Sequence, residues 1–281
     1  MRYTRNLVGN AVVATYLQKT LKNGIVPHAQ LWVGPDHIGK TTFLSNYLFT
    51  AWCDTQLACL RCRPCRQLQH DSHAGLRWLD GTTLDMATLR AVLSEAAETT
   101  FVTRQRAIVI TQADQLSLQI WNALLKQLEE PRSVMTVYLL AASMETLPAT
   151  IISRCSIIRF HPVSDAELVA AWPEDNAHIP LCHGRPGLVK KIRPDDIQHW
   201  TKLIEQAPVQ RVAAVTELKR DRASQQLEQL ETAVYQRLQA QPSQVALHAL
   251  RQIARARQSL STNAQVKLIM TNLLLNIFPS L

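Results

Sequence analysis

Length, composition and charge narrow the possible functions before any motif is considered. The 281 residues are 47% hydrophobic, which is enough for one large domain or two to three small domains with real cores. Lys and Arg number 30 against 22 Asp and Glu, and the net charge of +8 favours an anionic partner such as nucleic acid or nucleotide. The longest apolar stretch, Leu268 to Phe278, is too short and too polar to cross a bilayer, so we expect a cytoplasmic protein with no membrane partner.

One stretch, residues 34–42, fits the phosphate-binding template G-x-x-x-x-G-K-[ST]. A predicted buried strand, residues 30–33, runs into it, and a predicted helix, residues 41–50, follows with its N-terminus facing an anion. In this template the glycines turn backbone N–H groups toward phosphate oxygens, the lysine reaches the β- and γ-phosphates, and the following hydroxyl can hold Mg²⁺. A plain glycine-rich turn would not require that lysine and hydroxyl. We expect ATP or ADP with Mg²⁺ to bind at Gly34, Gly39, Lys40, Thr41 and Thr42.

Four of the six cysteines have the spacing C-x5-C-x2-C-x2-C. In a cytosolic chain this favours a metal or buried thiols over disulfides. The surrounding loop is polar and rich in arginine, so it could not bury the thiols without a metal, and the spacing differs from those of iron–sulfur proteins. The pattern predicts a closed structural Zn²⁺ site with four thiolate ligands, Cys53, Cys59, Cys62 and Cys65. Cys155 and Cys182 are isolated, and we expect them to be buried thiols.

Strands alternate with helices up to residue 161. The first predicted helix, Arg5 to Asn23, has an apolar face of Val8, Val12, Leu17 and Leu21 and a stop signal at Asn23-Gly24. This alternation predicts an α/β fold with a five-stranded parallel sheet covered on both faces. The predicted strands are 30–33, 76–79, 106–111, 136–141 and 157–160, and the later helices are 86–99 and 116–129, the last ending before Pro131.

Beyond His161 the pattern changes to helices without strands. Helices are predicted over Ser164–Trp172 and from Gly184 to about Ile192, with a linker at residues 194–196. Four or so amphipathic helices follow over residues 197–278, with breaks at Pro208, 241–243 and 261–263. This last part contains no glycine and no catalytic constellation, which is typical of a packing or assembly module.

Several motifs occur in a fixed order from Asn6 to about Gly187. They are Leu7-Val8-Gly9-Asn10, His28-Ala29, the phosphate loop, the four-cysteine insert, His73, Asn122 to Pro131 (NALLKQLEEP), Leu147 to Cys155 (LPATIISRC) and Gly184-Arg185-Pro186-Gly187. In this combination the chain resembles the AAA+ subunits of the bacterial DNA polymerase III clamp loader. The resemblance implies an AAA+ P-loop domain over residues 1–161 with a zinc insert at 53–65. It also implies a small helical lid over 162–195 and an all-α C-terminal domain over 196–281 that joins a collar.

The end of the third strand departs from the pattern of a working ATPase. Such an enzyme ends this strand with an acidic pair, which holds Mg²⁺ and helps to activate the attacking water. Here the strand is followed by Thr111-Gln112, and Asp114 comes two positions too late. Loss of both carboxylates should cripple hydrolysis. The chain therefore resembles the delta-prime subunit, the stator, more than the gamma/tau motor, and we expect a component of the polymerase holoenzyme without intrinsic ATPase activity.

The resemblance also assigns two arginines. Arg154 of Ser153-Arg154-Cys155 would be an arginine finger that reaches the nucleotide of a neighbouring subunit, and Arg185 would be a sensor arginine for a bound γ-phosphate. The residues alone predict only that Arg154 caps a helix or pairs with a surface carboxylate. The implied partners are the gamma/tau and delta subunits, with the sliding clamp and primer–template DNA contacted through the assembly.

Two other functions stay open at the level of sequence. One is a self-sufficient motor of the gamma type whose acidic function comes from Asp114 or Glu129. The other is a sequence-independent DNA-binding module, motivated by the net charge of +8.

Overall fold

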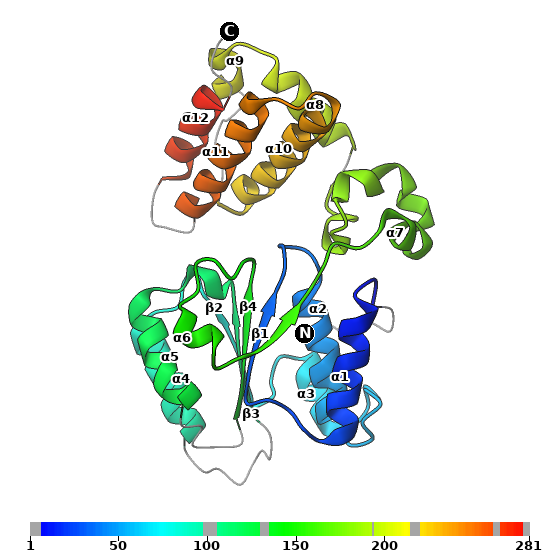
Figure 1. Cartoon of the computed structure of the whole chain (residues 1–281), viewed down its shortest axis with the longest axis vertical. Coiled ribbons are helices and arrows are strands. Elements are labelled where there is room, and N and C mark those ends of the chain that lie inside the picture. The colour runs from blue at the N-terminus through cyan, green and yellow to red at the C-terminus, as the bar shows by residue number, and fades with distance from the viewer. Residues whose placement is uncertain are drawn as a thin grey trace. The chain divides into compact units, whose positions relative to one another are not determined.

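The computed structural model describes residues 7–97, 106–129, 135–192, 194–213, 220–260 and 265–277. Contacts divide the chain into two compact units, Met1–Pro173 with Gly184–Gly187, and Glu174–His183 with Leu188–Leu281. The first unit contains a β-sheet, and the described residues of the second form helices only (Figure 1). None of the helices in the described ranges is both long and apolar enough to span a membrane.

A single parallel sheet forms the centre of the first unit. Its strand order is β2-β3-β4-β1-β5. The strands are β1 Ala29–Val33, β2 Leu76–Asp80, β3 Arg106–Thr111, β4 Met135–Ala141 and β5 Ser156–Arg159. The inner strands β3, β4 and β1 are buried on both faces along most of their length, and their residues are mostly apolar. All five predicted strands are confirmed, with bounds that shift by at most one residue.

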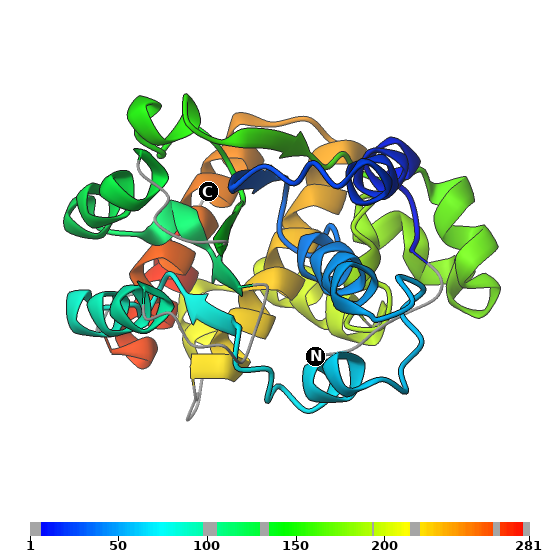
Figure 2. The same cartoon turned by 90° about the horizontal axis from the view of Figure 1, so that it is seen from below.

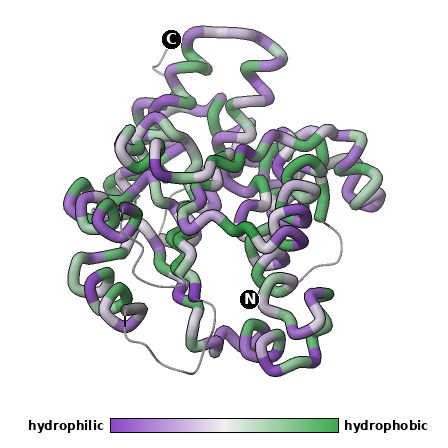
Figure 3. The backbone as a smooth tube through the Cα atoms, turned by 60° about the horizontal axis from the view of Figure 1, so that its bottom comes forward, coloured by the Kyte–Doolittle hydropathy of each residue, from purple (hydrophilic) through white to green (hydrophobic). Residues whose placement is uncertain are grey.

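Helices cover both faces of this sheet (Figures 1 and 2). One face carries α1 Ala11–Asn23, α2 Lys40–Trp52 and α3 Arg63–Gln69, and the other carries α4 Met86–Ala97, α5 Leu118–Glu129 and α6 Ala149–Ile152. Side chains alternate between the two cores, since Trp32 packs under α1 and α2 whereas its neighbour Leu31 packs under α5. Figure 3 shows hydrophilic and hydrophobic residues alternating along the helices, as one-sided burial requires.

The start of α1 differs from the prediction. The helix begins at Ala11, because Gly9 and Asn10 adopt left-handed backbone conformations with φ of 69° and 50°. A Cβ atom on Gly9 would lie 2.2 Å from Val163 Cγ2, so only glycine fits there. The predicted apolar face is wrong at Val12, which is 84% exposed, and the buried side chains are Val13 and Leu17.

The predicted stop at Gly24 is confirmed, because this residue adopts the left-handed C-cap conformation with φ of 68°. The short helix α3 was missed because its residues are polar, and it starts with a proline in its first turn. Several predicted boundaries lie outside the described residues. They are the stop at Pro131, the break at 261–263 and the segment ends at Arg5, Asn6, Thr99 and Phe278.

Two predictions after β5 need correction. The helix expected from Gly184 to Ile192 is only the 3₁₀ turn η3, Pro186–Leu188, because proline and two glycines within the segment interrupt it. The expected linker at residues 194–196 is instead the first turn of α8, where proline fits and the two aspartates favour the positive helix end. The predicted helix over 164–172 is confirmed as α7, Asp165–Ala171, with a capping box formed by Ser164 and Glu167.

The second unit is a helical bundle. Its long helices pack in the pairs α8 with α10, α10 with α11 and α11 with α12. Trp200 Nε1 donates to Gln229 Oε1 at 3.1 Å inside the bundle, and Gln229 Nε2 donates to Asp196 Oδ2 at 2.8 Å. The helices are α8 Pro194–Ile204, α9 Pro208–Ala213, α10 Arg220–Ala240, α11 Gln244–Leu260 and α12 Val266–Asn276. Besides η3, the 3₁₀ elements in the described ranges are η1 Ala113–Gln115 and η2 Pro173–Cys182.

Candidate nucleotide site, arginine finger and cysteine cluster

The predicted phosphate loop joins the carboxyl end of β1 to the start of α2. Gly34 N donates to Ala141 O at 3.2 Å, which fixes the start of the loop beside β4. A Cβ atom at this position would lie 2.8 Å from Phe160 Cβ. Gly39 is the N-cap of α2 and has φ of 104°, a conformation that only glycine adopts without strain. Both glycines of the template are therefore required by the local backbone.

Lys40, Thr41 and Thr42 lie together around one cavity of about 270 Å³. Lys40 Nζ donates to Pro35 O at 3.1 Å and also to Gly34 O. Burial lowers the pKa of Lys40, while the carboxylates of Asp36 and Asp114 raise it and offset part of this effect. The loop lysine is thus held over the loop carbonyls at the cavity, within reach of an anion that would replace those contacts.

The end of β3 borders the same cavity without a carboxylate. Both Thr111 and Gln112 line it. Thr111 Oγ1 donates to Leu79 O at 3.3 Å, and Gln112 adopts a left-handed conformation with φ of 48°. Asp114, in η1, accepts from Ala142 N at 3.1 Å through Oδ1 and from Gln115 Nε2 at 3.3 Å through Oδ2. The first acidic residue after β3 is therefore engaged in holding η1 to the end of β4.

The segment Gly184–Gly187 lies against the phosphate loop. Gly187 N donates to His37 O at 2.9 Å, and Gly187 also lines the cavity. Gly184, with φ of 69°, is held by Val163 N, which donates to Gly184 O at 2.8 Å. Arg185 is partly buried and is not among the described residues that line the cavity. The structure thus places Gly187, rather than Arg185, directly at the loop.

Arg154 lies near the amino ends of the parallel strands, whereas the phosphate loop lies at their carboxyl ends. It stands between α6 and β5, where β5 begins, whereas the loop follows the end of the parallel strand β1. Its guanidinium Nη2 is 2.7 Å from Glu129 Oε1, and Nη1 donates to Thr150 O at 3.0 Å. The Arg154 side chain is 38% exposed. Because the strands are parallel, Arg154 cannot serve the chain's own loop.

The four predicted zinc ligands meet at one place, beside the C-terminal end of α2. The Sγ atoms of Cys53, Cys59, Cys62 and Cys65 all lie within 4.8 Å of one another. Sulfur ligands of one tetrahedral metal ion with metal–sulfur bonds of about 2.3 Å lie about 3.8 Å apart, so small side-chain shifts would complete the shell. The donor set therefore fits a structural zinc ion.

Backbone N–H groups favour the thiolate form at two of these sulfur atoms, those of Cys53 and Cys59. Cys59 N donates to Cys53 Sγ at 3.3 Å, and Cys62 N donates to Cys59 Sγ at 3.4 Å. Burial raises the pKa of the Cys53 thiol, but the N–H of Cys59 and contacts from Thr55 more than offset this and bring the pKa to about 5. Backbone N–H groups, that of Arg61 first, also lower the pKa of Cys59, whereas burial raises the pKa of Cys65.

The remaining motif residues have structural roles. His73 is buried, and its ring centroid lies 4.5 Å from that of Trp52. His73 Nδ1 accepts from Gly75 N at 3.2 Å, and burial lowers the pKa of the ring. Burial also raises the pKa of the Cys155 thiol to about 11. Of the two isolated cysteines, Cys182 is fully buried, as expected, and Cys155 is partly buried.

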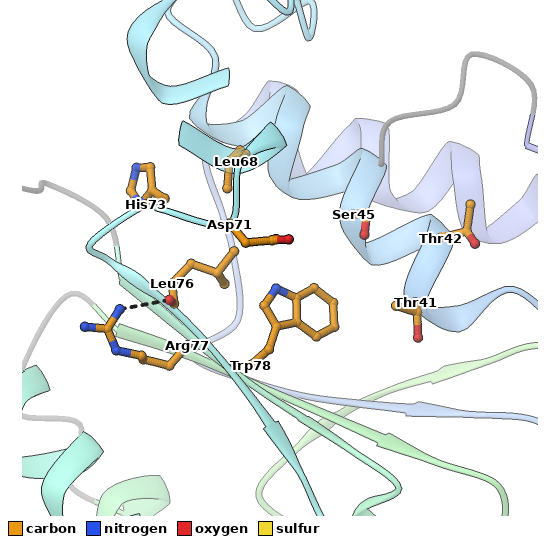
Figure 4. Close-up of a pocket in the computed structure, with 9 residues that line it drawn as sticks. All are labelled: Thr41, Thr42, Ser45, Leu68, Asp71, His73, Leu76, Arg77 and Trp78. Carbon is orange, nitrogen blue, oxygen red and sulfur yellow. Dashed lines mark hydrogen bonds between the residues drawn. The ribbon is translucent and has the colours of Figure 1, made fainter. Parts of the chain in front are cut away.

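A second cavity of about 620 Å³ lies between α2, α3 and β2 (Figure 4). It shares Thr41 and Thr42 with the loop cavity. Figure 4 shows the Trp78 indole and the Asp71 carboxylate extending into the space between the strand and the helix. The N-terminal half of α2 is therefore open on the side of β2.

The amino-acid sequence matches one family model and several characterised relatives. The model described as DNA polymerase III, delta subunit, matches residues 9–164. The chain belongs to this DNA polymerase III family. It is 28% identical over 155 residues to DNA polymerase III subunit delta' of Bacillus subtilis, covering 54% of this chain and 47% of the relative. It is 26% identical over 171 residues to subunit gamma of Buchnera aphidicola, covering 59% and 47%.

These matches confirm the resemblance to AAA+ clamp-loader subunits, of the delta-prime or gamma/tau type, without separating the types. The chain spans about half the length of these two relatives. Among solved structures, a DNA polymerase III gamma subunit-related protein from Thermotoga maritima superposes with a TM-score of 0.49 at 14% identity, covering 93% of this chain and 98% of the other. The RuvB protein of the same organism gives a TM-score of 0.47 at 14% identity, covering 70% and 64%.

Two residues of the chain have roles that sequence reasoning missed. Asn10 Nδ2 donates to His161 O at 3.0 Å, and Asn10 Oδ1 accepts from His161 N at 2.8 Å. This pair ties the segment before α1 to the end of β5, next to the phosphate loop. Glu129 holds Arg154. The Gly9-Asn10 dipeptide carried a signal for the first contact, since both are residues that tolerate left-handed backbone, but no signal identified the partner.

Proposed function

We propose that this chain is the delta-prime-like stator of a bacterial DNA polymerase III clamp loader and that it donates Arg154 to the nucleotide site of a neighbouring subunit. The observation that carries the proposal is the position of Arg154, which is partly exposed and lies at the amino ends of the parallel strands, away from the chain's own phosphate loop. A guanidinium group in this position can stabilise a γ-phosphate only in another subunit. Arginine fingers supplied by a neighbour contribute about 10³ to 10⁵ in rate.

The chain's own loop binds ATP or ADP with Mg²⁺ and does not turn it over. Gly34, Gly39, Lys40, Thr41 and Thr42 would hold the phosphates and the metal. Arg185, two residues before the cavity-lining Gly187, would turn toward a bound γ-phosphate to act as the sensor arginine. The absence of a carboxylate directly after β3 supports a site without a metal-positioning acid or a water-activating base. Bound nucleotide would then act as a structural ligand that stabilises the subunit.

The proposed architecture has three parts, an AAA+ domain over residues 1–161, a lid over 162–195 and a collar domain over 196–281. The collar would join gamma/tau and delta subunits in a hetero-oligomer that loads the sliding clamp on primed DNA in the cytoplasm. Exposed apolar side chains on the described helices of the second unit would be available for such contacts. They include Val209, Leu247, Leu268 and Leu275.

The cysteine cluster would hold one structural Zn²⁺ through Cys53, Cys59, Cys62 and Cys65. All four positions of a tetrahedral ion would be filled by protein, so the ion would have no open position for water or substrate. The positive charges of Arg61, Arg63 and Arg66 nearby would offset the net negative charge of a tetrathiolate site.

The alternative function is an ATP-hydrolysing motor of the gamma/tau type. Its specific support is the intact phosphate loop together with Asp114, whose charge raises the pKa of Lys40. Glu129 cannot supply the catalytic carboxylate, because it pairs with Arg154 at the amino ends of the strands. The motor would show ATP turnover by the isolated chain that is lost in both Lys40→Ala and Asp114→Asn.

The stator proposal is tested by ATP turnover of a reconstituted loader. The chain would carry Arg154→Ala or the control Arg159→Ala. Arg159 is also exposed, but it is the last residue of β5. We expect at least a tenfold loss in the first loader and none in the second, with an inert isolated chain. Equal turnover in the two loaders would contradict the proposal.

A further inference from the structure

Glu129 occupies an unfavourable place for a carboxylate. It is the last residue of α5, where the helix dipole presents its negative end. The side chain is 49% exposed, so water screens its charge, and its ion pair with Arg154 adds little to stability. The net contribution to folding is small because the ordering of two flexible side chains offsets their attraction, so the main consequence of the pair is the order that it gives Arg154.

The two contacts of Arg154 fix the plane of its guanidinium group. Nη2 meets Glu129 Oε1 at 2.7 Å, and Nη1 donates to Thr150 O at 3.0 Å, so the anchors act on different nitrogens. An arginine side chain has many rotamers, and two such anchors favour one orientation before a partner arrives. A guanidinium group has five N–H donors, so these two contacts leave further donors to meet phosphate oxygens.

We propose that Glu129 is a positioning residue that pre-orients Arg154 for the neighbouring subunit's nucleotide. This inference rests on the proposed finger role of Arg154. Glu129 itself touches neither nucleotide nor metal, and it acts only through the arginine. Removing the carboxylate leaves the charge and reach of Arg154 intact but frees its orientation, and a misplaced catalytic group slows a reaction without weakening substrate binding to the same degree.

The test is a double-mutant cycle in the reconstituted loader, with wild type, Glu129→Gln, Arg154→Ala and the double variant. We expect Glu129→Gln to lower kcat for ATP by about fivefold to tenfold with little change in KM. In the Arg154→Ala background the same substitution should change nothing further, because the residue through which it acts is gone.

A matched control is available in Glu95→Gln, which removes the carboxylate of another exposed ion pair, that with Arg77. The side chains of Glu95 and Arg77 are 54% and 38% exposed, close to the 49% and 38% of Glu129 and Arg154. This control should leave kcat unchanged. Size-exclusion chromatography of each loader checks that the subunit still assembles.

Three results would overturn the inference. Unchanged kcat in Glu129→Gln, beside a slow Arg154→Ala loader, would show that the carboxylate is dispensable while the stator proposal stands. A loss in the double variant that equals the product of the single losses would show that Glu129 acts elsewhere. Failed assembly of Glu129→Gln would assign it a structural role. Unchanged turnover in Arg154→Ala, by contrast, would refute the stator proposal itself.

Discussion

Gly187→Ala would disturb the contact between the Gly184–Gly187 segment and the phosphate loop. Gly187 N donates to His37 O at 2.9 Å, and the two backbones touch. An added Cβ would lie 2.9 Å from His37 O, 3.1 Å from His37 Cβ and 3.2 Å from His37 Cα, all inside the 3.4 Å at which ordinary contact begins. Because two of these atoms are backbone, the loop and the segment must separate by several tenths of an ångström.

The magnitude of this disturbance follows from the clash. Overpacking of this kind costs about 1–3 kcal/mol. His37 is part of the loop whose N–H groups would face the phosphates, so we expect most of the cost to appear as weaker nucleotide binding. A loss of about 1–3 kcal/mol corresponds to an ADP dissociation constant raised about fivefold to 150-fold.

The assay is a titration of the isolated chain with fluorescent ADP and Mg²⁺. Gly24→Ala is the control, because its Cβ meets nothing within 4 Å and its φ of 68° costs alanine only conformational strain at the end of α1. Both variants should lose stability, but only Gly187→Ala should lose affinity, and Lys40→Ala should abolish binding. Wild-type affinity in Gly187→Ala would refute the claim that this segment fixes the loop.

Three further predictions concern the cysteines and the N-terminal segment. Metal analysis should find one zinc ion per chain, and Cys65→Ser should lose the zinc and melt at a lower temperature; an intact, zinc-free wild-type chain would contradict this. Asn10→Ala removes both hydrogen bonds to His161, so its free energy of unfolding should fall by about 1–3 kcal/mol in denaturant titrations. The pKa of about 11 for Cys155, against 9.0 for a free thiol, should slow its alkylation at pH 8 about 100-fold relative to the denatured chain, as mass spectrometry of its peptide can measure.

The sheet and the cysteine cluster could be predicted because their signals are local in sequence. Runs such as Arg106–Thr111 are apolar along most of their length, which a strand buried on both faces requires, and the structure returns the same bounds. The spacing of the cysteines likewise brings their sulfur atoms within 4.8 Å of one another. The α/β fold with five parallel strands is confirmed for these reasons.

Features that depend on contacts distant in sequence could not be predicted. The start of α1 is set by the approach of Gly9 to Val163, and the place of Gly187 is set by His37. Neither partner is visible from local periodicity. The residues alone predicted that Arg154 would pair with a surface carboxylate, and it does so with Glu129. Its finger role comes from the family resemblance and stays a prediction.

ATP turnover by a reconstituted loader in which only this subunit varies tests the central claim most directly. If the chain is a stator, Arg154→Ala should cut turnover by at least tenfold, because a neighbouring site loses its arginine. Lys40→Ala, which disables only the chain's own loop, should leave turnover close to that of wild type. The opposite pattern, with turnover lost in Lys40→Ala and kept in Arg154→Ala, would show that the chain is a motor and would contradict the stator proposal.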